Sequence, residues 1–141
     1  MMVSAHFDIR EFVPKPIYDQ YGANSIWFID HRLIEGAEWL RAHFNAPIII
    51  NNWHTGGKFQ ERGFRVPTTT TGARLSQHKF GRAIDFNVQG MTSDQVAKDL
   101  IDSGHIEESH FTTIEDPAFT QGWCHLDCRL TNQIELLIVK P

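Results

Sequence analysis

The chain has 141 residues, which is enough to bury one hydrophobic core, so we expect a single domain spanning residues 1–141. Its net charge of −4 provides no broad basic surface for nucleic acid. The chain also contains no run of 18 apolar residues that could form a membrane-spanning helix, so we expect no membrane partner. Residues 1–15 carry acidic side chains and lack the apolar stretch of a secretory signal. We therefore expect synthesis in the cytoplasm without a signal peptide, and a monomeric protein.

The first half of the chain predicts one long helix and one strand. Residues 12–25 are rich in turn-forming residues and predict a loop with about one helical turn. Asp30 is a candidate N-cap for a helix over residues 31–44, where apolar side chains recur at helical spacing: Leu33, Ala37, Leu40 and Phe44. Residues 47–53 are a β-branched run that predicts a buried strand. Residues 54–77 lack any period and predict a long loop, which in a small domain is usually functional.

The second half predicts several strands and one further helix. Residues 82–88 predict a short strand. Thr92 and Gln95 resemble a capping box that begins a helix, and Gly104 ends it. Three more strands are predicted, of which the first two form an antiparallel hairpin: residues 111–115, 123–129 and 133–139. The expected fold class is α+β, with a small, mostly antiparallel sheet and helices packed on one side.

The two cysteines, Cys124 and Cys128, lie four residues apart in one predicted strand. That spacing separates them by about 13 Å, which is too far for a disulfide. We interpret them as thiols that face the core, with a Cys-x-x-x-Cys metal pair as the alternative. The eight histidines are the one compositional excess, and histidine is the commonest metal ligand.

The sequence contains two pairs of a histidine and an aspartate. In WCHLDCR, strand alternation places His125 and Asp127 on one face with Trp123, and the apolar and thiol side chains on the other. His78 and Asp85 form the second pair. Two histidines and one carboxylate are a ligand set of catalytic zinc, which leaves a fourth position for a water whose pKa falls to about 7. The spacing of His78 and Asp85 is weak by itself, so a metal-free protein whose histidines are satisfied by hydrogen bonds is the alternative.

Together these residues resemble the M15 metallopeptidases, which include D-Ala-D-Ala carboxypeptidases, D,D-dipeptidases and phage L-alanyl-D-glutamate endopeptidases. The family signature S-x-H-x-x-G-x-A-x-D is matched by Ser76, His78, Gly81, Ala83 and Asp85. The later aromatic-x-H-x-D strand is matched by WCHLD, and the resemblance extends from residue 47 to residue 129. It implies a hedgehog/D,D-peptidase-like fold in which one zinc ion (Zn2+) is bound by His78, Asp85 and His125. We interpret Gly81 and Ala83 as small residues that let the backbone pack closely around this ion.

The resemblance also implies which residues contact the substrate. Family members carry an arginine before the first histidine that holds a carboxylate of the peptide substrate, and RGFR at residues 62–65 fits this pattern. We favour Arg65 over Arg62, and a guanidinium suits the role because it pairs a carboxylate bidentately. A solvated loop arginine is the alternative. Ser76 and Trp123 are further candidates for substrate binding, although Trp123 suits a core position equally well.

The sequence departs from the family at the general base. Many members carry a glutamate three residues before the last histidine, where this chain has Gly122. A base is still needed to take a proton from the attacking water and give it to the leaving amine. We expect Glu115 to serve, because a lengthened hairpin loop would keep it in place on the first strand of the hairpin. Asp127 and Asp116 are the other candidates.

The expected function is zinc-dependent hydrolysis of a peptide bond in a stem or cross-link peptide of bacterial peptidoglycan. A phage endolysin or virion-associated wall hydrolase, which reaches the cell wall after release or as part of the particle, fits this expectation. The signalling domain of hedgehog proteins has the same fold and metal set but acts by binding. A zinc-binding but inactive phage structural or interaction module is therefore the alternative, and Gly122 favours it.

Overall fold

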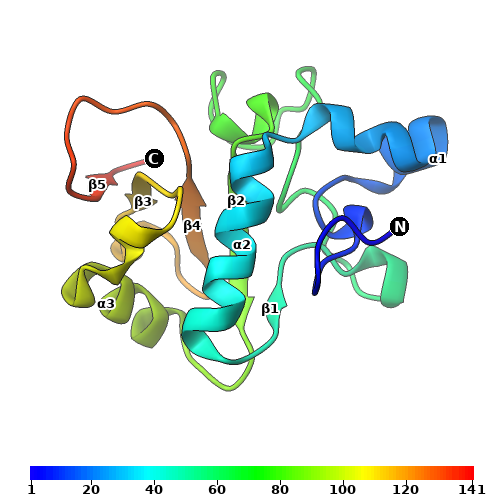
Figure 1. Ribbon diagram of the computed structural model, residues 1–141. Helices are drawn as coiled ribbons and strands as arrows, with labels where there is room; N and C mark the ends of the chain where they lie inside the picture. Colours follow the sequence, from blue (N-terminus) through cyan, green and yellow to red (C-terminus); the bar gives the residue numbers. More distant parts are fainter.

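The computed structural model describes residues 1–141 and has the predicted α+β fold (Figure 1). Its α-helices are α1 (Lys15–Tyr21), α2 (His31–Phe44) and α3 (Ser93–Ser103), and short 3-10 helices lie between many of the elements. Five strands form the sheet: β1 (Ile48–Ile49), β2 (Ala83–Val88), β3 (Thr113–Glu115), β4 (Cys124–Asp127) and β5 (Leu137–Val139). None of the helices has both the length and the apolar character needed to span a membrane.

The order of the strands in the sheet is β1-β2-β4-β3-β5. Every neighbouring pair is antiparallel except β3 and β5, which run parallel. The predicted hairpin is present as β3 and β4, and β4 also pairs with β2 on its other side. In the β2–β4 ladder Asp85 lies directly opposite His125. The topology therefore brings together two residues that are far apart in the sequence.

The two faces of the sheet carry different side chains. One face is apolar and fully buried, and it contributes Ile84, Phe86, Leu126 and Ile114 to a single core. Helix α2 contacts β1 and β2, and α3 contacts β2 and β4; both place side chains in the same core, so the helices cover this face as predicted. Figure 1 shows α2 crossing in front of β2. Because strand side chains alternate, the opposite face presents Asp85, His125 and Glu115.

Local capping signals fix the two long helices. The Asp30 side chain accepts a hydrogen bond from the Arg32 backbone N–H, and α2 has the bounds that the sequence predicts. At α3 the Thr92 and Gln95 side chains each accept from the other residue's backbone N–H, which confirms the capping box. Gly104 ends α3 in the left-handed conformation, also as predicted.

Three predicted segments differ from the structure, and one of them, the strand predicted over residues 133–139, is reduced to β5 at its C-terminal end. Residues 12–25 contain the helix α1 rather than a loop with one turn, since proline in the first turn removes only an N–H that has no helical partner. Strand β1 is shorter than the predicted 47–53, because the chain turns away from the sheet after Ile49. The Asn51 backbone N–H then donates to the Glu11 carbonyl instead of to a neighbouring strand.

Both cysteines are buried free thiols, as predicted. Burial raises the pKa of Cys124 to about 12 and that of Cys128 to about 11. The Cys124 Sγ donates to the Ser93 carbonyl and the Cys128 Sγ to the Arg82 carbonyl. Neither thiol belongs to the group of side chains that can hold a metal ion.

Candidate metal centre

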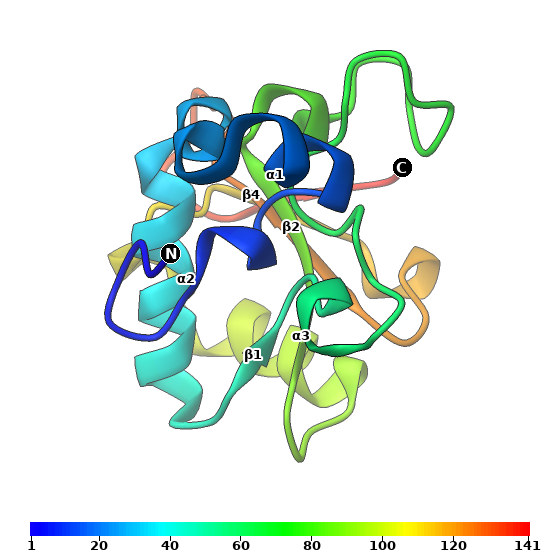
Figure 2. The same ribbon diagram turned by 90° about the vertical axis from the view of Figure 1, so that its right-hand side faces the viewer.

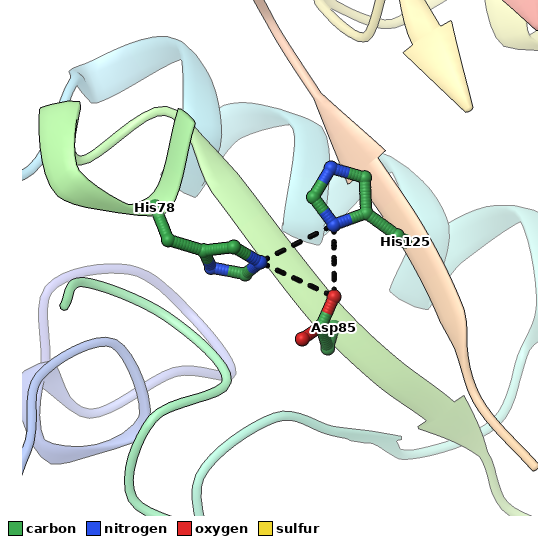
Figure 3. Close-up of side chains that lie close together, drawn as sticks. All are labelled: His78, Asp85 and His125. Atoms are coloured by element: carbon green, nitrogen blue, oxygen red, sulfur yellow. Dashed lines mark hydrogen bonds and ion pairs between the residues drawn. The ribbon is translucent and has the colours of Figure 1, made fainter. Parts of the chain in front are cut away.

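The three predicted ligands, His78, Asp85 and His125, meet on the polar face of the sheet (Figure 3). Asp85 and His125 come from the paired strands β2 and β4, where the register places them opposite each other. His78 comes from a 3-10 helix, Gln77–Phe80, that directly precedes β2. Ser76 caps this helix by accepting a hydrogen bond from the His78 backbone N–H. All three ligand side chains are buried.

The donor atoms of these side chains form a small triangle. His78 Nε2 lies 3.2 Å from Asp85 Oδ1 and 3.2 Å from His125 Nδ1, and His125 Nδ1 lies 2.9 Å from Asp85 Oδ1. Two ligand atoms bound about 2.0–2.1 Å from a tetrahedral zinc ion are about 3.3 Å apart. The observed separations are close to that value. The group therefore fits an ion of the size and ligand preference of zinc, and it can hold a metal ion.

Each ligand side chain is also held in its orientation by a hydrogen bond to a residue outside the triangle. His78 Nδ1 lies 2.7 Å from the Gly63 carbonyl, so this nitrogen carries the proton and Nε2 is left with its lone pair. His125 Nε2 lies 3.2 Å from Asp127 Oδ2, which turns Nδ1 toward the centre. Arg65 Nη2 donates to Asp85 Oδ2 at 2.8 Å, leaving Oδ1 to face the two histidines.

Asp127 is in turn held by Arg129. The Arg129 Nε donates to Asp127 Oδ1 at 2.8 Å, and its Nη2 donates to Oδ2. The carboxylate of Asp127 is completely buried. Burial favours its neutral form, but the hydrogen bonds from Arg129 and His125 outweigh burial and lower its pKa. Asp127 is therefore an ionised anchor for the outer edge of the His125 ring.

The charges in the triangle favour an ion pair when no metal is bound. Burial alone would lower the pKa of His125, but its hydrogen bonds with Asp127 and Asp85 raise it to about 9. Burial would raise the pKa of Asp85, but its hydrogen bonds with His125 and His78 hold it well below its usual range. A cation that enters the site replaces a proton on His125 and finds a carboxylate that is already ionised.

Glu115 lies beside the triangle on the neighbouring strand. Ile114 pairs with Leu126 in the β3–β4 ladder, so the next step of the same register places Glu115 beside His125. Its Oε1 lies 4.0 Å from His125 Nδ1, and the side chain is partly exposed. Asp85, His125 and Glu115 thus lie side by side on three adjacent strands. This is the arrangement that a lengthened hairpin loop was expected to allow.

The other two candidate bases occupy different surroundings. Asp127 has no access to solvent and is held by Arg129, so its position suits an orienting role. Asp116 accepts a hydrogen bond from the Ala118 backbone N–H and caps a short helix, Pro117–Phe119, and its own side chain does not line the cleft. Gly122 lies in the exposed β3–β4 connection, where its carbonyl accepts from the Asn87 side chain. Of the three carboxylates, Glu115 alone lines the cleft beside the histidines.

A cleft of about 500 Å³ opens over His78, Asp85 and His125. One wall comes from the long loop that precedes His78, and the other comes from the β3–β4 connection and the end of the chain. Figure 2 shows this loop projecting on the same side of the molecule as the C-terminus. The cleft is therefore built by three segments that the sheet brings together.

The predicted substrate-binding residues fall into two groups. Arg65, Ser76 and Trp123 line the cleft. Arg62 does not, since its Nη1 donates to the Asn87 side chain at 2.6 Å and its guanidinium lies 3.6 Å from the centre of the Phe59 ring. Arg65 is mostly engaged by the protein, because its Nε donates to the Glu61 carbonyl and its Nη2 to Asp85.

Gly81 has a different role from the one that we predicted. It ends the 3-10 helix that carries His78 with a φ of +67°, and a Cβ there would lie 1.9 Å from the Phe28 carbonyl oxygen. Its carbonyl also accepts from the Asp30 backbone N–H. Gly81 therefore docks the helix of His78 against the start of α2, and it does not pack around the ion.

Three residues of the site were not identified from the sequence. The Gly63 carbonyl gave no signal, because any residue type supplies a carbonyl. Arg129 follows Asp127 by two positions, and the same Asp-x-Arg pattern with the same pairing occurs at Asp30 and Arg32. That pattern could have indicated the Arg129 ion pair. Lys140 lines the cleft only because β5 pairs with β3.

Comparisons with known proteins do not assign this chain to a family. No family model matches it, and neither a curated protein nor a solved structure matches it significantly. The geometry of the site and the motifs in the sequence are therefore the features that indicate a function.

Proposed function

We propose that this protein is a zinc-dependent peptidase that hydrolyses a peptide bond in bacterial peptidoglycan, as the M15-like motifs suggest. The observation that carries the proposal is the triangle of His78, Asp85 and His125 at the floor of a cleft, with Glu115 at 4.0 Å from His125. Cell wall degradation by a phage endolysin or a virion-associated hydrolase is the setting that we infer for this activity.

The residues have separate roles in the proposed reaction. His78, Asp85 and His125 would hold a zinc ion, which would supply a Lewis acid for the scissile carbonyl and lower the pKa of water. Glu115 accepts the proton of the attacking water and delivers it to the leaving amine. Arg65 keeps Asp85 turned toward the ion, and Asp127 fixes the ring of His125. Trp123 and Ser76 border the space in which the peptide lies.

The choice of peptidoglycan follows from the motif S-x-H-x-x-G-x-A-x-D and its partner strand WCHLD. In the M15 family this combination accompanies cleavage of D-Ala-D-Ala, L-Ala-D-Glu or cross-bridge bonds. The cleft has room for a short extended peptide, and it opens at the surface between its two walls, where a polymeric substrate can reach it. We include all three bond types in the proposal.

A zinc-binding module without catalysis is the second candidate. The observation that favours it is Gly122, which stands where many M15-like peptidases carry their glutamate. In this reading the cleft binds a partner, and Glu115 takes part in an ion pair with His125 rather than in proton transfer.

Cleavage of purified peptidoglycan by the zinc-loaded protein distinguishes the two candidates. We expect release of soluble muropeptides by the wild type, none by His78→Ala, and a loss of about 10²–10⁴-fold in rate for Glu115→Gln. Asp116→Asn is the matched control, because it removes the same charge from the adjacent residue outside the cleft. A wild type that holds zinc and cleaves no muropeptide bond would refute the peptidase and leave the binding module.

A further inference from the structure

The cleft is richer in positive charge than the protein as a whole. The chain carries a net charge of −4, yet three cationic side chains line the cleft: Arg65, Arg129 and Lys140. The acidic side chains that line it are Asp85, a candidate metal ligand, and Glu115, and the buried Asp127 lies behind Arg129. Once a divalent cation is bound, the cleft has an excess of positive charge and attracts an anionic ligand.

Arg65 is poorly suited to receive that anion. Its Nε and Nη2 already donate to the Glu61 carbonyl and to Asp85, and the residue is buried. Its Nη1 makes no hydrogen bond with the protein, but the side chain is only 11% exposed, so a carboxylate that bound to its fork would have to displace Asp85 and release a metal ligand. Other cations of the cleft are therefore better placed than Arg65 to hold a carboxylate of the substrate.

Arg129 is pre-oriented for binding an anion. Its Nε and Nη2 are fixed by the buried Asp127, while Nη1 makes no hydrogen bond with the protein and the side chain is 32% exposed. A guanidinium that is already immobilised loses little side-chain entropy when it binds a ligand. Asp127 also contacts His125, so Arg129 is separated from the metal site by a single carboxylate.

Lys140 is the cation of the cleft that has no ion pair. Its Nζ lies 5.9 Å from the centre of the Phe119 ring and contacts no carboxylate. It follows Val139, which pairs with Glu115 in the β3–β5 ladder. Lys140 is therefore close in the fold to the proposed base and lines the same cleft as Arg129.

We propose that Arg129 and Lys140 form a subsite for a free carboxylate of the substrate peptide. The inference rests on the proposed function and narrows its substrate class to acidic peptides with an unblocked carboxylate next to the cleaved region. Arg129 supplies an oriented N–H and Lys140 a mobile ammonium, and both contribute charge-assisted hydrogen bonds.

The structure offers a matched control for Arg129. Arg32 makes the same contacts with Asp30 through Nε and Nη2, and it lies outside the cleft. Replacing either arginine by glutamine removes one charge and one Asp-x-Arg ion pair. Only the change at Arg129 alters the cleft. Lys98→Gln on α3 is the corresponding control for Lys140→Gln, since Lys98 is an exposed lysine remote from the cleft.

The test is calorimetric binding of a stem tetrapeptide, L-Ala-γ-D-Glu-L-Lys-D-Ala, to zinc-loaded protein with the Glu115→Gln background. The same peptide with amidated carboxyl groups is the second probe. We expect the free acid to bind about tenfold more tightly than the amide. Arg129→Gln and Lys140→Gln should each remove most of that preference, whereas Arg32→Gln and Lys98→Gln should retain it.

The outcomes separate this proposal from the proposed function. Equal binding of acid and amide, or equal effects of Arg129→Gln and Arg32→Gln, would overturn the subsite even if the wild type cleaves peptidoglycan. A preference for the acid that depends on Arg129 and Lys140, in a wild type that cleaves nothing, would support the subsite and reject the peptidase. Because Lys140 is exposed, Lys140→Gln keeps the test decisive even if Arg129→Gln does not fold.

Discussion

At the scale of single residues, each candidate ligand is held by a second group of the protein. The Gly63 carbonyl fixes the tautomer of His78, and Asp127 holds the ring of His125. Arg65 binds one carboxylate oxygen of Asp85 and leaves the other to face the histidines. Such outer contacts hold metal ligands in position before the ion arrives. They also explain why the site contains buried charges, since each one is paired.

Asp127→Asn should lower the affinity for zinc by about 10–100-fold, because the ring of His125 loses its anionic anchor. Competition with a metal-chelating dye measures this change. Asp8→Asn is the control, since Asp8 forms the same Asp-x-Arg pair with Arg10 away from the cleft. If the two variants bound zinc equally well, Asp127 would have no positioning role.

At the scale of elements, strand β4 organises the site. It pairs with β2 through Asp85 and His125, and with β3 in the register that brings Glu115 beside His125. The 3-10 helix that carries His78 must also end where its histidine can reach Asp85 and His125. Gly81 sets this end by approaching the Phe28 carbonyl more closely than any residue with a Cβ can.

Gly81→Ala should therefore destabilise the fold and weaken the metal site together. Gly90→Ala is the matched control, because Gly90 also has a positive φ but has open space at its Cβ position. We expect Gly90→Ala to cost about 1–2 kcal/mol, and Gly81→Ala to cost about 1–3 kcal/mol more through overpacking. Urea unfolding and zinc affinity measure the two effects. Equal stability of the two variants would contradict the docking role of Gly81.

Local signals account for the elements that the sequence predicts well. The caps at Asp30 and Thr92 define α2 and α3 because their hydrogen bonds involve only near neighbours. The length of β1 was wrong because the partner of Asn51 is Glu11, far away in the chain. Helix α1 was predicted as only about one turn because Pro14 and Pro16 resemble turn signals when their position at the start of a helix is unknown.

At the scale of the whole molecule, the sheet order decides which predicted site residues meet. The motifs indicate that His78, Asp85 and His125 belong together. The position of Glu115 follows from the local β3–β4 hairpin that the sequence predicts, whereas the presence of Arg129 and Lys140 in the cleft depends on β4 also pairing with β2 and on β5 pairing with β3. Pairings between distant strands have no local signal, so the positions of Arg129 and Lys140 could not be derived from the sequence alone.

The buried charges predict how the stability of the metal-free protein depends on pH. The pKa of His125 is raised to about 9 by hydrogen bonds with Asp127 and Asp85, which outweigh burial. The stabilisation from its protonated form is complete below the ordinary pKa of about 6.5 and is lost as the pH rises through about 9. Thermal unfolding of the metal-free protein should therefore shift to lower temperature between pH 6.5 and 9.

Zinc should remove this dependence, because the ion replaces the proton on His125. The zinc-loaded protein is therefore the control, and its unfolding temperature should change little over the same pH range. Metal-free protein whose stability rises with pH in this interval would show that His125 is not the protonated partner of Asp85 and Asp127.

The central claim is that His78, Asp85 and His125 bind one zinc ion. Equilibrium dialysis of the purified protein against zinc, followed by metal analysis, tests it most directly. We predict one zinc ion per chain in the wild type and in Glu115→Gln, and loss of tight binding in His78→Ala and His125→Ala. His110→Ala, which changes a histidine paired with Glu35 outside the cleft, should bind zinc like the wild type. A wild type without zinc, or zinc retained by both ligand variants, would contradict the account.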